Sequence, residues 1–167
     1  QYITDLNKEM TNIQLVMGNT KEDIIRMADG YNQLAKQLGA TTLEVAKGSL
    51  EFIRQGKTVQ ETQELLKASM MMSKLGNVEA AQSTEYLTSA LNGYQLQAES
   101  AVGIVDKLVA VDNIAATSVS ELASALQRSA NSASQAGVSM EELISYIGTV
   151  SSVTRKSAES IGESFSR

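Results

Sequence analysis

The stretch Ala116–Val150, which reads ATSVSELASALQRSANSASQAGVSMEELISYIGTV, decides the fold class of this chain. It contains two helix starts, Ser118-Val-Ser-Glu121 and Ser139-Met-Glu-Glu142. Each start places a hydroxyl side chain at the N-cap and a glutamate three residues later, so side chain and backbone satisfy each other's free N–H groups. Between them stands Gly137, a residue suited to the left-handed conformation at which helices commonly end. The stretch therefore predicts two helices joined by a short turn.

The same helix-stop and N-cap pattern recurs along the chain: a glycine, one residue, a hydroxyl residue as the cap, two residues and an acid. Further copies are Gly39-Ala-Thr41-Thr-Leu-Glu44 and Gly56-Lys-Thr58-Val-Gln-Glu61, with softer versions after Gly76 and Gly93. A series of such signals, each ahead of an apolar stripe, is strong evidence for helices joined by short turns. The helices predicted in this way cover 41–54, 58–75, 77–92, 97–111, 118–135 and 139–152, with a frayed tail from about 156.

Composition supports an all-α fold. The chain has 167 residues, no proline, and aromatic residues at only 4%, so its core consists mainly of Ala, Leu, Ile, Val and Met. Such a core suits helices better than a sheet, and turn-rich β folds normally use some proline. We expect a compact multi-helix bundle of short capped helices. A spacing of roughly 17 to 20 residues between helix starts also fits a stack of helical hairpins.

Residues 1–38 carry a heptad pattern. Its a positions are Ile3, Met10, Met17, Ile24, Tyr31 and Leu38, and its d positions are Leu6, Ile13, Thr20, Met27 and Leu34. This spacing predicts one longer heptad-patterned N-terminal helix, although Gly18-Asn19-Thr20 with Asp23 also resembles a helix stop followed by a cap, which would make a hairpin. We expect a helical arm over 1–38 with coiled-coil-like heptads and a helical core domain over 39–167.

The apolar seam at the start of this arm needs a partner helix. One option is self-association with another copy in a parallel coiled coil, and the other is packing on the body of its own domain. The residues of this seam are Ile3, Leu6, Met10, Ile13 and Met17.

Two further patterns concern packing. The segment 98–111 is apolar on most sides, which predicts a central helix with Val105 and Leu108 buried. Glycines inside predicted helices lower helix stability, so we attribute them to close helix–helix approach, with a conformational hinge as the alternative. These glycines are Gly48, Gly103, Gly148 and Gly162.

The residue inventory argues against catalysis. Cysteine and histidine are absent, which removes disulfides, thiolate nucleophiles, the usual zinc ligands and the commonest general acid–base side chain. We therefore predict no catalytic, cofactor-binding or metal-binding residues and no cofactor. Acids near helix starts, such as Asp23, Glu79 and Glu142, are expected to complement the helix dipole rather than bind a cation. The residues that would bind a partner cannot be named from the sequence.

Charge and hydropathy address partners and location. The net charge of −5 argues against a nucleic-acid partner, which normally meets a basic face. No apolar run approaches the roughly 20 residues that span a bilayer, so no membrane span is expected in this segment. The opening residues show no signal peptide, and a start on Gln1 suggests a fragment of a much longer protein.

The order of segments resembles the core region of phage tail tape-measure proteins over about residues 20–167. The segments that carry the resemblance are Ala35-Lys-Gln-Leu-Gly39, Phe52–Glu61, Ile104–Asn113, Ser120–Leu126, Ala136–Leu143 and Ser157–Phe165. The resemblance implies a structural protein of the virion that occupies the tail lumen, sets tail length and scaffolds assembly of the tail tube. It also implies the tail tube protein, tail assembly chaperones and tail tip proteins as partners, and the host cytoplasm as the place of assembly.

The resemblance supplies no catalytic residue for this segment, so an enzyme is not expected. A different class of function fits the helical pattern equally well without the resemblance, namely a helical protein–protein interaction or signalling module, or a secreted helical effector.

Overall fold

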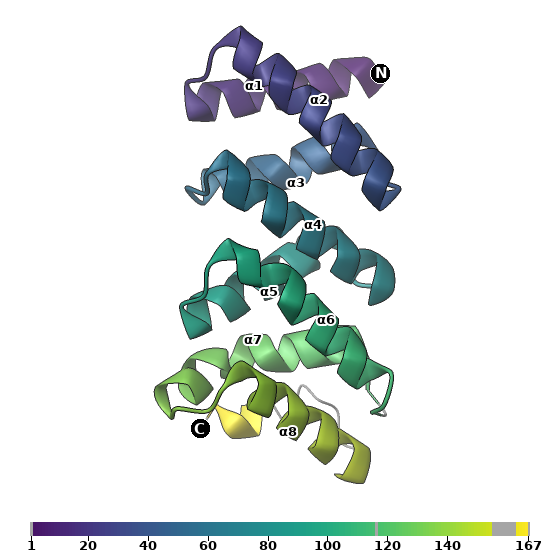
Figure 1. Cartoon of the computed structure of the whole chain (residues 1–167), viewed down its shortest axis with the longest axis vertical. Helices are drawn as coiled ribbons and strands as arrows, with labels where there is room; N and C mark the ends of the chain where they lie inside the picture. Colours follow the sequence, from purple (N-terminus) through teal and green to yellow (C-terminus); the bar gives the residue numbers. More distant parts are fainter. Residues whose placement is uncertain (1, 116, 155–162, 167) are drawn as a thin grey trace. The chain divides into compact units, whose positions relative to one another are not determined.

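The computed structural model describes residues 2–115, 117–154 and 163–166. The longer elements within these residues are all helices, and no strand occurs among them (Figure 1). The predicted all-α class is therefore confirmed. The predicted frayed tail falls largely on 155–162, outside the described residues. The helices are α1 (Tyr2–Met17), α2 (Lys21–Leu38), α3 (Thr42–Arg54), α4 (Val59–Leu75), α5 (Ala80–Tyr94), a short 3-10 helix η1 (Ala98–Ser100), α6 (Ala101–Asp112), α7 (Val119–Gln135) and α8 (Met140–Thr154).

The chain divides into two compact units, residues 1–67 and 68–167. In the first unit, α1 and α2 contact each other and both pack against α3. Residues 1–38 therefore share a compact unit with the residues that follow them. The division into an arm over 1–38 and a core over 39–167 stays a prediction about which parts fold independently.

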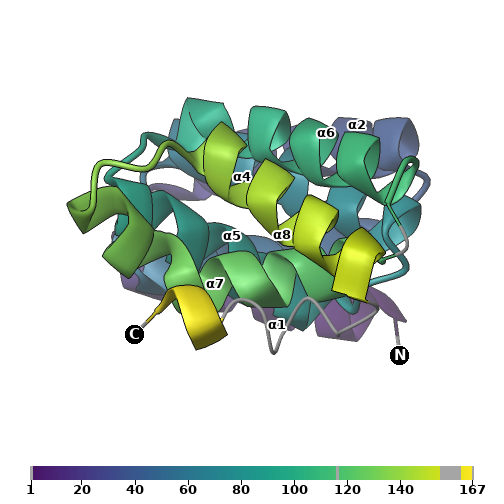
Figure 2. The ribbon, with the colours of Figure 1, turned by 90° about the horizontal axis from the view of Figure 1, so that it is seen from below.

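In the second unit, α5 packs against α7 and α6 packs against α8. Helices α7 and α8 also lie against each other, as Figure 2 shows. Each hairpin of this unit, α5–α6 and α7–α8, thus packs against the other through next-but-one helices. The compact bundle is confirmed, and within this unit it has the hairpin-on-hairpin arrangement that the spacing of helix starts had left open.

The turns explain where the helices end. The N-caps predicted at Thr41, Thr58, Ser118 and Ser139 are all present, each with reciprocal hydrogen bonds to the glutamate three residues later. The weaker patterns after Gly76 and Gly93 also coincide with turns. There Asn77 and Gln95 take the left-handed conformation, with φ of 51° and 53°.

The prediction of one long helix over 1–38 is wrong, and the alternative of a helical hairpin is correct. Helix α1 ends at Met17, and Gly18 takes the left-handed conformation with φ +68°. Helix α2 then begins behind Thr20, whose hydroxyl accepts from the Asp23 N–H while the Asp23 carboxylate accepts from the Thr20 N–H. The heptad count continues into α2 because residues 18–20 are themselves three of its positions, with Thr20 at position d.

The core of the second unit contains α6, but this helix is not buried on every side. Val105 and Leu108 are fully buried at 0% exposure, as predicted. Asp106 and Ala110 on the same helix are exposed. The predicted burial of Val105 and Leu108 is confirmed, and the contacts that α6 makes with α5, α7 and α8 cover only part of its circumference.

Close approach explains some of the glycines inside helices. A Cβ on Gly48 would lie 2.8 Å from the Leu66 side chain, and one on Gly148 would lie 2.5 Å from the Val111 side chain. Gly103 contradicts the expectation, because a Cβ there would meet only the Lys107 Nζ at 4.0 Å. Gly162 lies outside the described residues.

Another close approach between two helices involves Gly93, which the sequence pattern predicts to lie at a turn. Gly93 lies within α5, and a Cβ there would come within 2.7 Å of the Ala130 Cβ and 3.1 Å of the Asn131 backbone nitrogen on α7. Helices α5 and α7 thus pack at a separation that only glycine allows at this position.

Truncating a buried leucine of α6 should strongly destabilise the protein. We expect Leu108→Ala to lower the free energy of unfolding by about 2–4 kcal/mol, because it removes buried contacts and leaves a cavity. Leu15→Ala is the matched control, since Leu15 is 77% exposed on α1 and its loss should change stability by no more than about 0.5 kcal/mol. Urea unfolding followed by circular dichroism measures both, and equal midpoints for the two variants would contradict the burial of Leu108.

A pair of glycine substitutions tests the α5–α7 approach. Gly93→Ala should destabilise by about 1–3 kcal/mol, because backbone and Cβ atoms of α7 must move. Gly103→Ala introduces the same methyl group into an open position inside α6 and should stabilise by up to about 1 kcal/mol through helix propensity. Thermal melts show whether each variant has a lower or a higher melting temperature than the parent. A Gly93→Ala variant as stable as the parent would show that α5 and α7 are not in close contact.

Candidate partner-binding surfaces

The seam predicted for self-association is divided between the core and the surface. Met10 is 6% exposed and Ile13 is 0% exposed, on a helix that packs against α2 and α3. Leu6 and Met17 are half-buried, whereas Ile3 is 72% exposed. Of the two options left open, packing on its own unit is the one observed for Met10 and Ile13. The five residues therefore do not form one exposed seam in this fold.

Other large apolar side chains are exposed singly on several elements. Isolated exposed apolar residues are normal on soluble proteins, so each alone is weak evidence for an interface. Two of them are linked, because the Tyr146 ring stacks on the Phe165 ring with centroids 6.5 Å apart. The exposed set in the first unit is Tyr2, Ile3, Leu15, Val16 and Ile25, and in the second unit it is Leu75, Leu96, Ile114, Tyr146, Val153 and Phe165.

A shallow hollow of about 240 Å³ lies between α2 and α4 in the first unit. Its lining offers three side-chain amides, one carboxylate and one ammonium group, which could form hydrogen bonds and ion pairs with a polar partner surface. No pattern in the sequence predicts this hollow, because its residues come from two helices that are distant in the chain. The lining residues are Gly30, Gln33, Leu34, Gln37, Gln63, Glu64 and Lys67.

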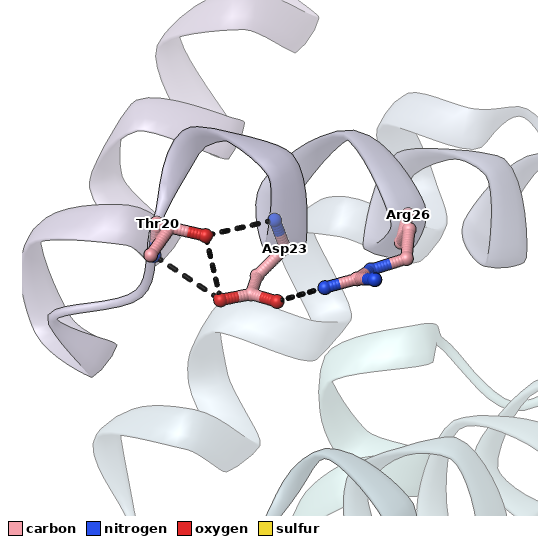
Figure 3. A network of polar contacts seen from close by, with 3 residues as sticks. All are labelled: Thr20, Asp23 and Arg26. Atoms are coloured by element: carbon pink, nitrogen blue, oxygen red, sulfur yellow. Dashed lines mark hydrogen bonds and ion pairs between the residues drawn. The ribbon is translucent and has the colours of Figure 1, made fainter.

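Several carboxylates serve helix ends and local ion pairs. At the start of α2, the Asp23 carboxylate accepts from the Arg26 guanidinium at 2.5 Å and from the Thr20 hydroxyl at 2.8 Å (Figure 3). The hydrogen bond from Arg26 and those from Thr20 lower the pKa of Asp23. Hydrogen bonds from Ser139 lower the pKa of Glu142 in the same way. The interpretation of Asp23 and Glu142 as helix-start acids is thereby supported.

At the start of α8, an ion pair between Lys107 and Glu141 lies close to the buried Tyr94 hydroxyl. The Lys107 ammonium lies 2.9 Å from the Glu141 carboxylate and lowers its pKa. The Tyr94 hydroxyl is shielded from solvent and has no hydrogen-bond partner among the described residues. Burial, together with the negative charges of Glu141 and Glu142, raises the pKa of Tyr94 to about 12.

The described residues contain neither a cluster of metal-ligating side chains nor a membrane-spanning helix. Within 2–115, 117–154 and 163–166, no group of three or more acidic, histidine or cysteine side chains is placed to hold a metal ion. In the same part of the chain, no helix combines the length and the apolar character needed to cross a membrane.

The raised pKa of Tyr94 makes stability depend on alkaline pH. The folded state favours the neutral phenol, so this contribution is complete below the unfolded pKa of about 10 and is lost as pH rises through about 12. Tyr94→Phe should therefore flatten the fall in unfolding free energy over that range. Urea unfolding at several pH values, with phenolate absorbance recorded in parallel, measures both effects.

The matched variant for this measurement is Glu141→Gln, which keeps Tyr94 buried but removes one neighbouring negative charge. It should move the highest tyrosine titration step to lower pH. A titration near pH 12 that persists in Tyr94→Phe would show that another tyrosine is responsible.

Comparison with known proteins identifies the family. A family model described as phage-related minor tail protein matches residues 32–167. The chain is also 25% identical over 157 residues to the tape measure protein of Pneumococcus phage Dp-1, an alignment that covers 93% of this chain and 14% of that protein. No solved structure matches the chain significantly. Because the family model matches well over half of its length, the chain belongs to the phage-related minor tail protein family.

Proposed function

We propose that this chain is a segment of a tail tape measure protein that helps to set tail length and scaffolds the tail tube during assembly. The supporting observation is family membership over 32–167, together with the similarity of nearly the whole chain to a tape measure protein. The chain spans only about one seventh of that relative's length, so the activity of the whole protein is an inference. In this proposal the segment works by binding and spacing, without catalytic turnover.

A helical chain suits such a role for a geometric reason. Helices rise 1.5 Å per residue, so 167 residues would span roughly 250 Å as continuous helix. Folded hairpins shorten that span, because consecutive helices run back along each other. The number of residues can therefore set a distance, provided that the segment is extended when the tail is measured.

The proposed partners follow from the same role. They are the tail tube protein, tail assembly chaperones and tail tip proteins, with the segment in the tail lumen of the virion and in the host cytoplasm during assembly. The surfaces that this segment offers are separate exposed apolar side chains and the polar hollow between α2 and α4. A role in binding nucleic acid is not proposed, given the net charge of −5.

The decisive experiment changes the length of this segment in the intact phage. An in-frame deletion of the residues corresponding to 1–167 should shorten tails by roughly 250 Å if the segment is measured as continuous helix, and by less if it is measured as hairpins. A tandem duplication should lengthen tails by the same amount. Electron microscopy of purified virions gives the lengths.

A substitution that changes stability but not residue number is the control. Leu108→Ala is expected to destabilise the fold while keeping the chain at 167 residues, so tails that assemble should keep the parental length. Tails of parental length in the deletion mutant would contradict the proposal, because residue number would then have no effect on tail length.

A further inference from the structure

The joint between α1 and α2 is held by local contacts at its solvent-exposed side. Gly18 takes φ +68°, and a Cβ built on it would meet no atom within 4 Å. The hydrogen bonds that begin α2 run between Thr20, Asp23 and Arg26, all close to the joint in sequence (Figure 3). The bend therefore depends on the backbone of one glycine and on one capping network, rather than on packing around the glycine.

The apolar faces of α1 and α2 are in phase across this joint. Positions a and d place Met10 and Ile13 on α1 and Ile24 and Met27 on α2, and all four side chains are buried. If residues 18–20 became helical, the phase would be kept, because the joint occupies three positions of an unbroken heptad count. A continuous helix over 2–38 would then be amphipathic along its whole length, with one apolar face.

The contacts of α1 are separable from those of α2. Helix α1 packs mainly against α3, and the Tyr2 hydroxyl accepts from the Leu43 N–H at 3.4 Å. Helix α2 has its own contact with α3, through the buried hydrogen bond between the Tyr31 and Ser49 hydroxyls. If the joint opened, α2 could stay on α3 while α1 moved away and left its place on α3 vacant.

We propose that Gly18 is a hinge for exchange of α1 between two copies of this chain. In the exchanged dimer, α1 and α2 form one continuous helix, and α1 occupies on the partner's α3 the place that it occupies within its own chain in the monomer. The contacts of α1 with α3 and with α2 lie within one chain in the monomer and between chains in the exchanged dimer. The equilibrium between monomer and dimer therefore depends on the conformation of the joint and on protein concentration. This inference concerns the first unit alone and does not rest on the proposed tail function.

The second copy is the favoured occupant because Met10 and Ile13 already fit α3, and only another copy supplies the identical surface. A parallel coiled coil over 2–38 would instead take α2 off α3 and break the Tyr31–Ser49 hydrogen bond. That arrangement is less favourable, because the buried side chains of α3, among them Phe52 and Ile53, would lose their cover.

The hinge residue provides a clean test. Gly18→Ala disfavours the left-handed bend and favours continuous helix, with no clash at this open position, so it should raise the ratio of open to bent joints by roughly 30-fold per chain. Two chains open in each dimer, so the association constant should rise by about 1,000-fold. Gly18→Asn is the matched control, because asparagine tolerates the left-handed conformation and should remain mostly monomeric like the parent.

Two measurements on the full chain separate exchange from other outcomes. The chain lacks cysteine, so labels can be attached at Lys8→Cys and Asp29→Cys, where the native residues are exposed. Their separation should approach about 32 Å in a continuous helix and be clearly shorter in the hairpin. Mixing chains labelled singly at Lys8→Cys and at Lys47→Cys should give energy transfer between copies, because α1 would then lie on the partner's α3.

The proposal is supported if Gly18→Ala forms a dimer by sedimentation equilibrium, with the longer separation and with transfer between copies. It is overturned if Gly18→Ala stays a folded monomer, or if its dimer keeps the hairpin separation. Should Gly18→Ala fail to fold by circular dichroism, the parent chain refolded at high concentration serves instead. A parent that then yields only monomer at every concentration overturns the proposal as well.

Discussion

The fold depends on one recurring joint, in which a left-handed residue is followed by a single linker residue and an N-cap. The left-handed residue turns the chain away from the preceding helix, and the cap satisfies the free N–H groups of the next one. Thr20 and Thr41, which follow Gly18 and Gly39 in this way, make the reciprocal hydrogen bonds with Asp23 and Glu44. Because both ends of a helix are satisfied within a few residues, each helix is set locally and its neighbours can fold back upon it.

Packing between the helices depends on small side chains. Helix α5 approaches α7 at Gly93 and Ala130 so closely that a methyl group on Gly93 would overlap. The Ser129 hydroxyl on α7 is fully buried and donates to the Ala125 carbonyl at 2.6 Å, so it needs no partner on another helix. Where aromatic side chains are scarce, a short distance between helix axes supplies the packing density that large side chains provide elsewhere.

Most of the charged groups with a shifted pKa act over short distances at helix ends. Asp23, Glu61 and Glu142 all have a lowered pKa because each accepts hydrogen bonds at the start of its own helix. Lys107 and Glu141 pair at the edge of the second unit.

The sequence by itself determined the features that depend on neighbouring residues. The all-α class, the caps at Thr41 and Ser139 and the burial of Leu108 all follow from local spacing, because helix periodicity and capping act within one or two turns. The heptad phase of residues 1–38 is also a property of sequence, because it is read from the spacing of their apolar residues alone. Periodicity of this kind cannot decide where the chain bends, because the residues of the joint are themselves positions of the heptad count.

Only the tertiary structure decided which surfaces meet. It placed Met10 and Ile13 against their own unit rather than a second chain, and it brought α2 and α4 together to form the polar hollow. It also separated Gly93, which needs to be glycine, from Gly103, which does not. These outcomes depend on the distances between helices that are far apart in the chain, and a pattern within one helix carries no information about what lies against it.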